Sequence, residues 1–189
     1  MTKQNFRSQQ TNTKIQKAFF RLLKDKEFKD ITVGEIASTA KVGRSTFYSH
    51  YLDKYDLLEK IVQSFSNDFQ KLIDQRFSDD LFLYFDQTMS SLLDQLNQER
   101  NHLLLLLNIH TEFADLHREY QAILRNSFHN FIEKQGLTNQ LNVPVNYLTT
   151  LYSNVAMTFI IWQLENGKDG SIINFGQLLQ QRILNSPIC

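Results

Sequence analysis

The chain has 189 residues, of which 42% are hydrophobic and 21% are charged, a composition typical of globular proteins. It contains two prolines and six glycines, and so few helix breakers argue against a many-turned β architecture. The longest apolar run, residues 103–107, is far shorter than the ~20 residues that span a bilayer, and the N-terminus has no apolar signal core. The single cysteine, Cys189, excludes an intrachain disulfide and fits a reducing compartment, so we expect a cytoplasmic protein without membrane contact.

Charge is unevenly distributed although the net charge is zero. Residues 1–60 hold 12 Lys and Arg against 7 Asp and Glu, a net charge of +5. Residues 61–189 hold 8 Lys and Arg against 13 Asp and Glu, a net charge of −5. This split favours a cationic module that faces a polyanion, joined to an acidic module that does not. A chance difference between two solvated helical segments is the alternative.

The first 60 residues predict three short helices and the start of a fourth. Residues 1–10 are expected to form a polar arm, and a first helix to begin at Asn12 or Thr13. Thr32 and Glu35 match a capping box, which predicts a second helix over 33–39. A turn at 41–43 leads to a third helix over 44–50, and Asp53 caps a fourth whose apolar residues continue to residue 73.

The remaining residues predict five more helices. They span about 81–98, 99–113, 114–134, 145–166 and 171–184, with Gly136 and Gly167 as helix-ending glycines. No segment shows the sustained alternation of a strand, so the predicted fold is all-α with about nine helices. We expect two domains, an N-terminal one with three helices over 1–62 and a C-terminal helical one over 63–189.

Residues 31–50 form the pattern of a helix-turn-helix, with two short helices around a tight turn. Phe47 and Tyr51 can anchor the second helix in the core while its polar side chains face outward. Arg44 can pair with guanine edges, and a lysine in the first turn of the fourth helix opposes the helix dipole unless an anion such as phosphate is near. The predicted DNA-binding residues are Thr32, Arg44, Ser45, Thr46, Tyr48, His50 and Lys54.

The same stretch resembles the signature of the TetR family of bacterial transcriptional regulators. The matching segments are Ile31-Thr32, Ile36-Ala37, Val42-Gly43, Thr46-Phe47-Tyr48, Tyr51 and Lys54-Tyr55-Asp56-Leu57-Leu58. The resemblance implies a homodimeric repressor that binds double-stranded DNA at an inverted-repeat operator through the seven residues named above. Many relatives release DNA on binding a small molecule, so it also implies an effector. Residues 162–168 weakly resemble a subgroup that includes regulators of dihydroxyacetone kinase operons.

Two positions depart from the family pattern. Lys41 stands where the turn commonly has glycine, and a left-handed conformation there would cost about 1–2 kcal/mol. Gly43 stands where the recognition helix commonly opens with serine, and glycine is a weaker cap.

Residues 145–166 and 171–184 carry wide apolar arcs, which predict packing on two sides. Two such helices and their symmetry mates would form a four-helix dimer interface. A monomeric helical core is the alternative. The predicted interface residues are Leu148, Leu151, Val155, Phe159, Trp162, Phe175 and Leu179.

Aromatic and polar residues of the C-terminal half could line a ligand cavity or equally form plain core. They are Phe85, Met89, His102, His110, Phe113, Tyr120, Phe128, Tyr147 and Tyr152. The sequence lacks metal-site spacing and the loop or nucleophile motifs of enzymes, so we expect no metal, no cofactor and no catalytic activity. An all-helical enzyme and a helix-turn-helix that binds protein rather than DNA are the rival interpretations.

Overall fold

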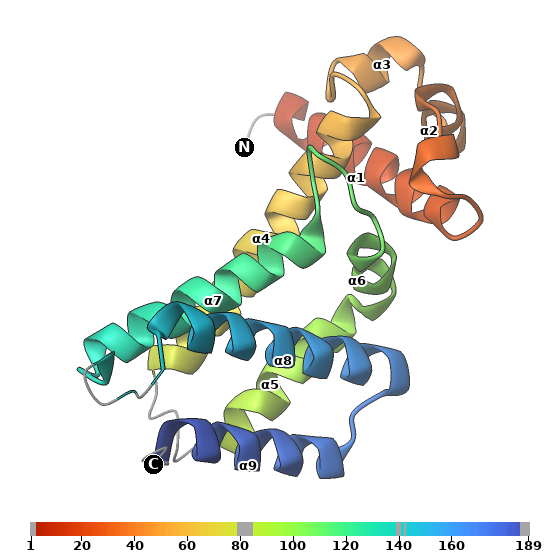
Figure 1. Cartoon of the computed structure of the whole chain (residues 1–189). Coiled ribbons are helices and arrows are strands. Elements are labelled where there is room, and N and C mark those ends of the chain that lie inside the picture. The colour runs from red at the N-terminus through yellow and green to blue at the C-terminus, as the bar shows by residue number, and fades with distance from the viewer. Residues whose placement is uncertain (1–2, 79–84, 139–140, 142, 186–189) are drawn as a thin grey trace. The chain divides into compact units, whose positions relative to one another are not determined.

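The computed structural model describes residues 3–78, 85–138, 141 and 143–185 (Figure 1). Within these residues the chain is all-α, as predicted, with nine α-helices and one short 3-10 helix, η1. None of the described helices combines the length and hydrophobicity of a membrane-spanning segment. The helices are α1 (Lys3–Leu23), η1 (Phe28–Asp30), α2 (Val33–Ala40), α3 (Arg44–Tyr48), α4 (Lys54–Ser78), α5 (Phe85–Gln98), α6 (Arg100–Leu107), α7 (Leu116–Lys134), α8 (Val145–Asn166) and α9 (Gly170–Asn185).

The chain divides into two compact units. The first comprises Met1–Phe65 together with Leu105–Asp115, and the second comprises Ser66–Leu104 and Leu116–Cys189. The first break lies close to the predicted boundary at residue 62. The inclusion of Leu105–Asp115 in the first unit was not predicted, because it depends on contacts between segments far apart in the sequence.

The first unit is built around the amphipathic face of α1, which packs on α2, and α2 contacts α3 (Figure 1). Ile15, Phe19, Ile36 and Phe47 are fully buried, and each such side chain contributes about 1.5–3 kcal/mol through burial. The Phe19 ring meets the edge of the Phe28 ring at 6.0 Å, which packs η1 against α1.

The predicted helix ends are present where local sequence determines them. Thr32 and Glu35 form the capping box of α2. The Asp53 carboxylate accepts hydrogen bonds from the backbone N–H groups of residues 55 and 56, at 2.7 and 2.9 Å, and so caps α4. Gly136 and Gly167, which follow α7 and α8, adopt φ angles of 65° and 88°. Glycine reaches these angles without the steric penalty of a side chain.

Two predicted boundaries are wrong. The helix α1 begins at Lys3 rather than at residue 12 or 13, because its polar first turns contain no helix breaker and carry no apolar stripe that would mark them. The helix α6 ends at Leu107 rather than near Phe113. The loop that follows is closed by Thr111, whose hydroxyl accepts from the Ala114 N–H at 2.9 Å and donates to the Ala114 carbonyl at 2.7 Å.

The second unit is a helical bundle in which α7 and α8 lie along one another and α5 contacts α8 and α9 (Figure 1). Two stacked aromatic pairs bind its helices together. Phe69 of α4 stacks on Tyr120 of α7 at 3.8 Å, and Phe128 of α7 stacks on Tyr152 of α8 at 4.1 Å. Such pairs add about 0.5–1.5 kcal/mol beyond burial.

Candidate nucleic-acid interface and effector cavity

The turn between α2 and α3 depends on one strained residue. Lys41 ends α2 with φ 56° and ψ 44°, and it is the one non-glycine residue with positive φ in the described part of the chain. The turn is closed by the Val42 N–H, which donates to the Ala37 carbonyl at 3.0 Å. Lys41, which stands where the family pattern commonly has glycine, therefore adopts the left-handed conformation. The steric cost of this conformation is about 1–2 kcal/mol.

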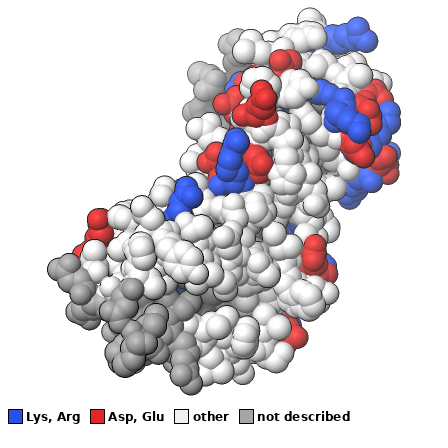
Figure 2. All heavy atoms as spheres, in the orientation of Figure 1, with Lys and Arg blue, Asp and Glu red and all other residues white. Residues whose placement is uncertain are grey.

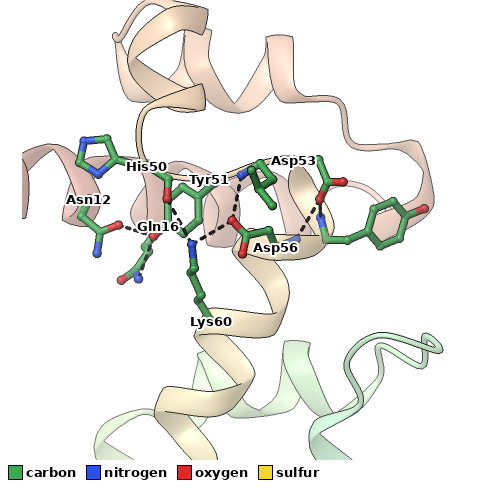
Figure 3. Close-up of polar contacts among 9 residues, drawn as sticks. Asn12, Gln16, His50, Tyr51, Asp53, Asp56 and Lys60 are labelled. Atoms are coloured by element: carbon green, nitrogen blue, oxygen red, sulfur yellow. Dashed lines mark hydrogen bonds and ion pairs between the residues drawn. The ribbon is translucent and has the colours of Figure 1, made fainter.

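The helix α3 is anchored from its buried side and from the loop that follows it. Phe47 is fully buried and Tyr51 is 3% exposed. The Tyr51 hydroxyl donates to the Asn12 side-chain oxygen and accepts from the Gln16 amide at 3.3 Å (Figure 3). Burial raises the pKa of Tyr51, so its hydroxyl stays protonated and can donate. These bonds tie the end of the recognition helix to α1.

A second set of contacts fixes the loop between α3 and α4 (Figure 3). The Lys60 ammonium lies 2.9 Å from an Asp56 carboxylate oxygen, donates to the His50 carbonyl at 3.3 Å and sits 5.1 Å from the centre of the Tyr51 ring. Asp56 also accepts from the Leu52 N–H at 2.8 Å. The loop is therefore held by side chains of α4, and α3 is presented on a rigid support.

The outer side of α3 carries most of the predicted contact residues. Arg44, Ser45 and Tyr48 are exposed, whereas Thr46 and His50 are half-buried. The Tyr48 side chain is 55% exposed, and its ring meets Phe47 edge-on at 5.7 Å. An arginine, a hydroxyl and a tyrosine on one side of a short helix can form hydrogen bonds with base edges and phosphates.

Arg44 lies directly against α2. A methyl group on Gly34, in the first turn of α2, would come within 2.8 Å of the Arg44 Nη2 atom. The guanidinium therefore occupies space that only a glycine leaves open. This places a cation beside the N-terminal end of α2, where unpaired backbone N–H groups also favour anions. Gly34 could not be singled out from the sequence, because a glycine inside a short helix gives no signal of the side chain it faces.

Thr32 is exposed at the start of α2, and its hydroxyl takes part in the cap. It donates to a Glu35 carboxylate oxygen at 2.8 Å and accepts from the Glu35 N–H at 3.3 Å. Hydrogen bonds from Lys26 and from Thr32 lower the pKa of Glu35 to about 2. The contact of Thr32 with a phosphate stays a prediction that rests on its position.

Lys54 has partners that its local sequence does not predict. Its ammonium donates to three backbone carbonyls, those of Phe28, Lys29 and Ile31, at 3.0, 2.8 and 2.8 Å. It also sits 4.9 Å from the centre of the Phe28 ring, and burial lowers its pKa. These carbonyls are the negative partners of Lys54 in this structure, and the bonds hold η1 against α4. A contact of Lys54 with a DNA phosphate stays a prediction.

The second unit contains a cavity of about 540 Å³. Of the predicted ligand residues, it brings together Met89 and Tyr152. Its wall also includes five predicted interface residues, so the two sets of predictions overlap. The described lining residues are Ile73, Arg76, Met89, Leu92, Leu124, Tyr152, Asn154, Val155, Ala156, Thr158, Phe159, Ile160, Trp162, Ile172, Phe175, Gly176 and Leu179.

Among the other predicted ligand residues, those whose side chains are described do not line this cavity. Tyr120 and Phe128 are buried in stacked core pairs. His102 lies 2.7 Å from the Glu99 carboxylate, and the Tyr147 side chain is 61% exposed.

Two further ligand candidates lie outside the second unit. His110 and Phe113 belong to the first unit, where Phe113 packs on Tyr55 at 5.5 Å. The side chain of Phe85 lies outside the described part of the chain.

The predicted interface residues separate into two groups. Leu148 is 4% exposed and belongs to the core of its own unit, so its side chain cannot contact a partner chain in this conformation. Leu151, Val155, Trp162 and Phe175 are 38–58% exposed, and Phe159 and Leu179 are half-buried. Leu178, which belongs to the same apolar arc of α9, is 60% exposed.

Comparison with known proteins agrees with this geometry. Residues 15–61, which contain α2 and α3, match the family described as bacterial regulatory proteins, tetR family. The chain is 28% identical over 111 residues, 56% of its length, to the uncharacterized HTH-type transcriptional regulator YxbF of Bacillus subtilis. It is 41% identical over 59 residues, 31% of its length, to the HTH-type dhaKLM operon transcriptional activator DhaS of Lactococcus lactis. The matches span 29% and 30% of the lengths of these two relatives.

The fold extends the similarity beyond the matched segment. A putative TetR-family transcriptional regulator from Syntrophomonas wolfei superposes with a TM-score of 0.72 at 16% identity, over 94% of this chain and 96% of that one. At this identity the likeness concerns the fold, and it includes both helical units.

Proposed function

We propose that this chain is a member of the TetR family of bacterial regulatory proteins and acts as a homodimeric, sequence-specific DNA-binding transcriptional regulator. The observation that carries the proposal is the outer side of α3, where Arg44, Ser45 and Tyr48 are exposed on a helix anchored by Phe47 and Tyr51. The proposal assigns base contacts to this helix and phosphate contacts to its flanks. DNA binding would place its action in the cytoplasm.

The chemistry of the side chains supports base contacts by some of them and backbone contacts by others. Arg44 is suited to guanine edges, and the methyl group of Thr46 is suited to thymine. Tyr48, His50 and Thr32 are suited to phosphate and sugar oxygens. Because the first 60 residues carry a net charge of +5, the domain as a whole attracts a polyanion.

The proposed dimer forms through α8 and α9. Leu151, Val155, Trp162 and Phe175 offer apolar surface there, and a patch of this kind is typical of protein interfaces. Two-fold symmetry would place two recognition helices about 34 Å apart, one turn of DNA, so the operator should be an inverted repeat. Sedimentation at micromolar concentration tests the dimer, and a 22.3 kDa species alone would reject it.

We propose repression as the outcome, with release by a small molecule that enters the cavity of the second unit. A dimer seated over a promoter blocks polymerase by occupancy. The relative DhaS is named an activator, so the direction needs its own test. In a reporter with the operator overlapping the promoter, deletion of the regulator should raise expression, and a fall would reverse the assignment.

Selection of bound sequences from random duplex DNA tests the function. The wild type should enrich an inverted repeat, and Arg44→Ala and Tyr48→Ala should lose it while keeping the wild-type thermal midpoint. Absence of enrichment by a folded dimer would favour the rival function, a helix-turn-helix that binds protein. Salt separates the two, since each phosphate contact adds about 0.9 to the slope of log affinity against log salt.

A further inference from the structure

Part of the wall of the cavity in the second unit belongs to the face proposed for dimerisation. Val155, Trp162 and Phe175 line the cavity, yet they are 38%, 48% and 58% exposed. A site that encloses an apolar ligand buries most of that ligand's surface. In a single chain, this part of the wall instead faces solvent.

The exposed face of α8 and α9 is almost free of charge. Glu165 is the one charged residue in the 22 residues of α8, and Arg182 is the one in the 16 residues of α9. Where Figure 2 shows described residues over α8 and the first turns of α9, few acidic or basic side chains are visible. Near a two-fold axis every residue approaches its own copy, so a charge there would face a like charge. A face without charge therefore suits a second copy of this chain.

We infer that a second copy of this chain closes the cavity, so that effector binding and dimerisation are coupled. The inference rests on the homodimer of the proposed function and goes further, because it makes the partner a part of the binding site. If each of the two sites of the dimer binds the effector more tightly than the monomer by some factor, saturating effector must strengthen dimerisation by the square of that factor.

The lining indicates the chemistry of the ligand. A volume of about 540 Å³ accommodates a small organic molecule, and the lining is mostly apolar. Arg76 is the one charged residue among the described lining residues. It is 5% exposed, and its guanidinium carbon lies 5.9 Å from the centre of the Phe77 ring. A planar guanidinium matches a carboxylate in shape and charge, so the geometry points to an apolar molecule with one anionic group.

Decanoate and 1-decanol, used below the micelle concentration of decanoate, are matched probes for this chemistry. They share a chain length and differ in charge. Trp162 is the only tryptophan in the chain and lines the cavity, so its emission reports binding in the full-length protein. Decanoate should bind at least about tenfold more tightly than decanol, and Arg76→Leu should remove the difference. Equal binding of the two probes, or no binding of decanoate, would overturn the assignment of ligand class.

The coupling is tested by titrating decanoate at protein concentrations below and above the dimerisation midpoint found by sedimentation. We expect affinity to rise by about tenfold or more on dimerisation, within the usual range of allosteric coupling. The dimerisation midpoint should fall by the square of that factor when decanoate is saturating, because each dimer holds two sites. Equal decanoate affinity in monomer and dimer, or a chain that never dimerises, would overturn the inference.

Leu151 allows the partner's contribution to be removed without touching the cavity. It is 40% exposed on α8 and is not a lining residue. Leu151→Asp should produce a folded monomer with the weak decanoate affinity of the dilute wild type. Asn130→Asp, on the exposed side of α7, introduces the same charge away from this face and should change neither property. A dimeric Leu151→Asp protein, or a monomer with full decanoate affinity, would contradict the coupling. These measurements contain no DNA, so a failure of operator binding is detected separately.

Discussion

The substitution Gly34→Ala is expected to weaken DNA recognition without lowering stability. The added methyl group of Gly34→Ala would lie 2.8 Å from the Arg44 Nη2 atom and 3.4 Å from the guanidinium carbon. The first distance is too short for a stable contact, and the atom that must move is the end of a flexible side chain. The backbone can therefore stay in place while the guanidinium is displaced from α2.

The two expected effects have opposite signs. Alanine is a better helix former than glycine, so stability should be unchanged or higher by up to about 1 kcal/mol. Loss of a paired arginine contact to a base costs about 1–3 kcal/mol, or roughly 5–150-fold in affinity for the selected operator. Gly170→Ala, at a position with no atom within 4 Å of the added methyl group, is the control and should bind as the wild type does.

Thermal unfolding and equilibrium DNA binding of the four proteins in a double-mutant cycle provide the assay. In the Arg44→Ala background, Gly34→Ala should cause no further loss of affinity, because the group it displaces is already absent. Wild-type affinity and base preference in Gly34→Ala would refute the reasoning, as would full additivity with Arg44→Ala, which would indicate a direct clash with DNA.

Three further predictions concern the support of the recognition helix. Lys41→Gly should raise the free energy of unfolding by about 1 kcal/mol in chemical denaturation, because it relieves the left-handed strain at φ 56°; a loss of stability would contradict that account. Lys54→Met should lower the free energy of unfolding by about 2 kcal/mol, because the bonds to three carbonyls are lost. The slope of log DNA affinity against log salt concentration should stay unchanged, and a slope smaller by about 0.9 would indicate that Lys54 contacts a phosphate. Glu35, whose pKa is lowered from 4.5 to about 2, stabilises the fold fully above pH 4.5 and loses this effect as the pH falls towards 2. The stability advantage of the wild type over Glu35→Gln should therefore shrink across that window, and a constant difference would show that the capping box does not depend on the charge.

Local sequence patterns predicted those parts of the fold that depend on neighbours within one helical turn. The capping box of Thr32 and Glu35 and the cap by Asp53 follow from spacings of three residues or fewer. The bounds of α8 were predicted correctly because a long apolar pattern ends at a glycine. The first turns of α1 were missed, since they are polar and carry no such pattern.

The features that could not be predicted depend on residues distant in the sequence. Lys54 bonds to carbonyls 23–26 residues earlier in the chain, and Arg44 rests on a glycine of the preceding helix. Leu148 belongs to the same apolar arc of α8 as Leu151, and only the packing of α7 and α5 decides which of the two is buried. In the same way, the cavity gathers side chains from five helices, so apolar composition alone could not distinguish lining residues from core.

The central claim is that the exposed side of α3 reads a DNA sequence. The most direct test measures the affinity of the full-length protein for the selected inverted repeat and for a scrambled duplex of equal length, at several salt concentrations. We predict a preference of about 10³-fold or more for the repeat, reduced in Arg44→Ala, together with a steep salt dependence on both duplexes. Equal affinity for the two duplexes, unchanged by Arg44→Ala, would contradict the account.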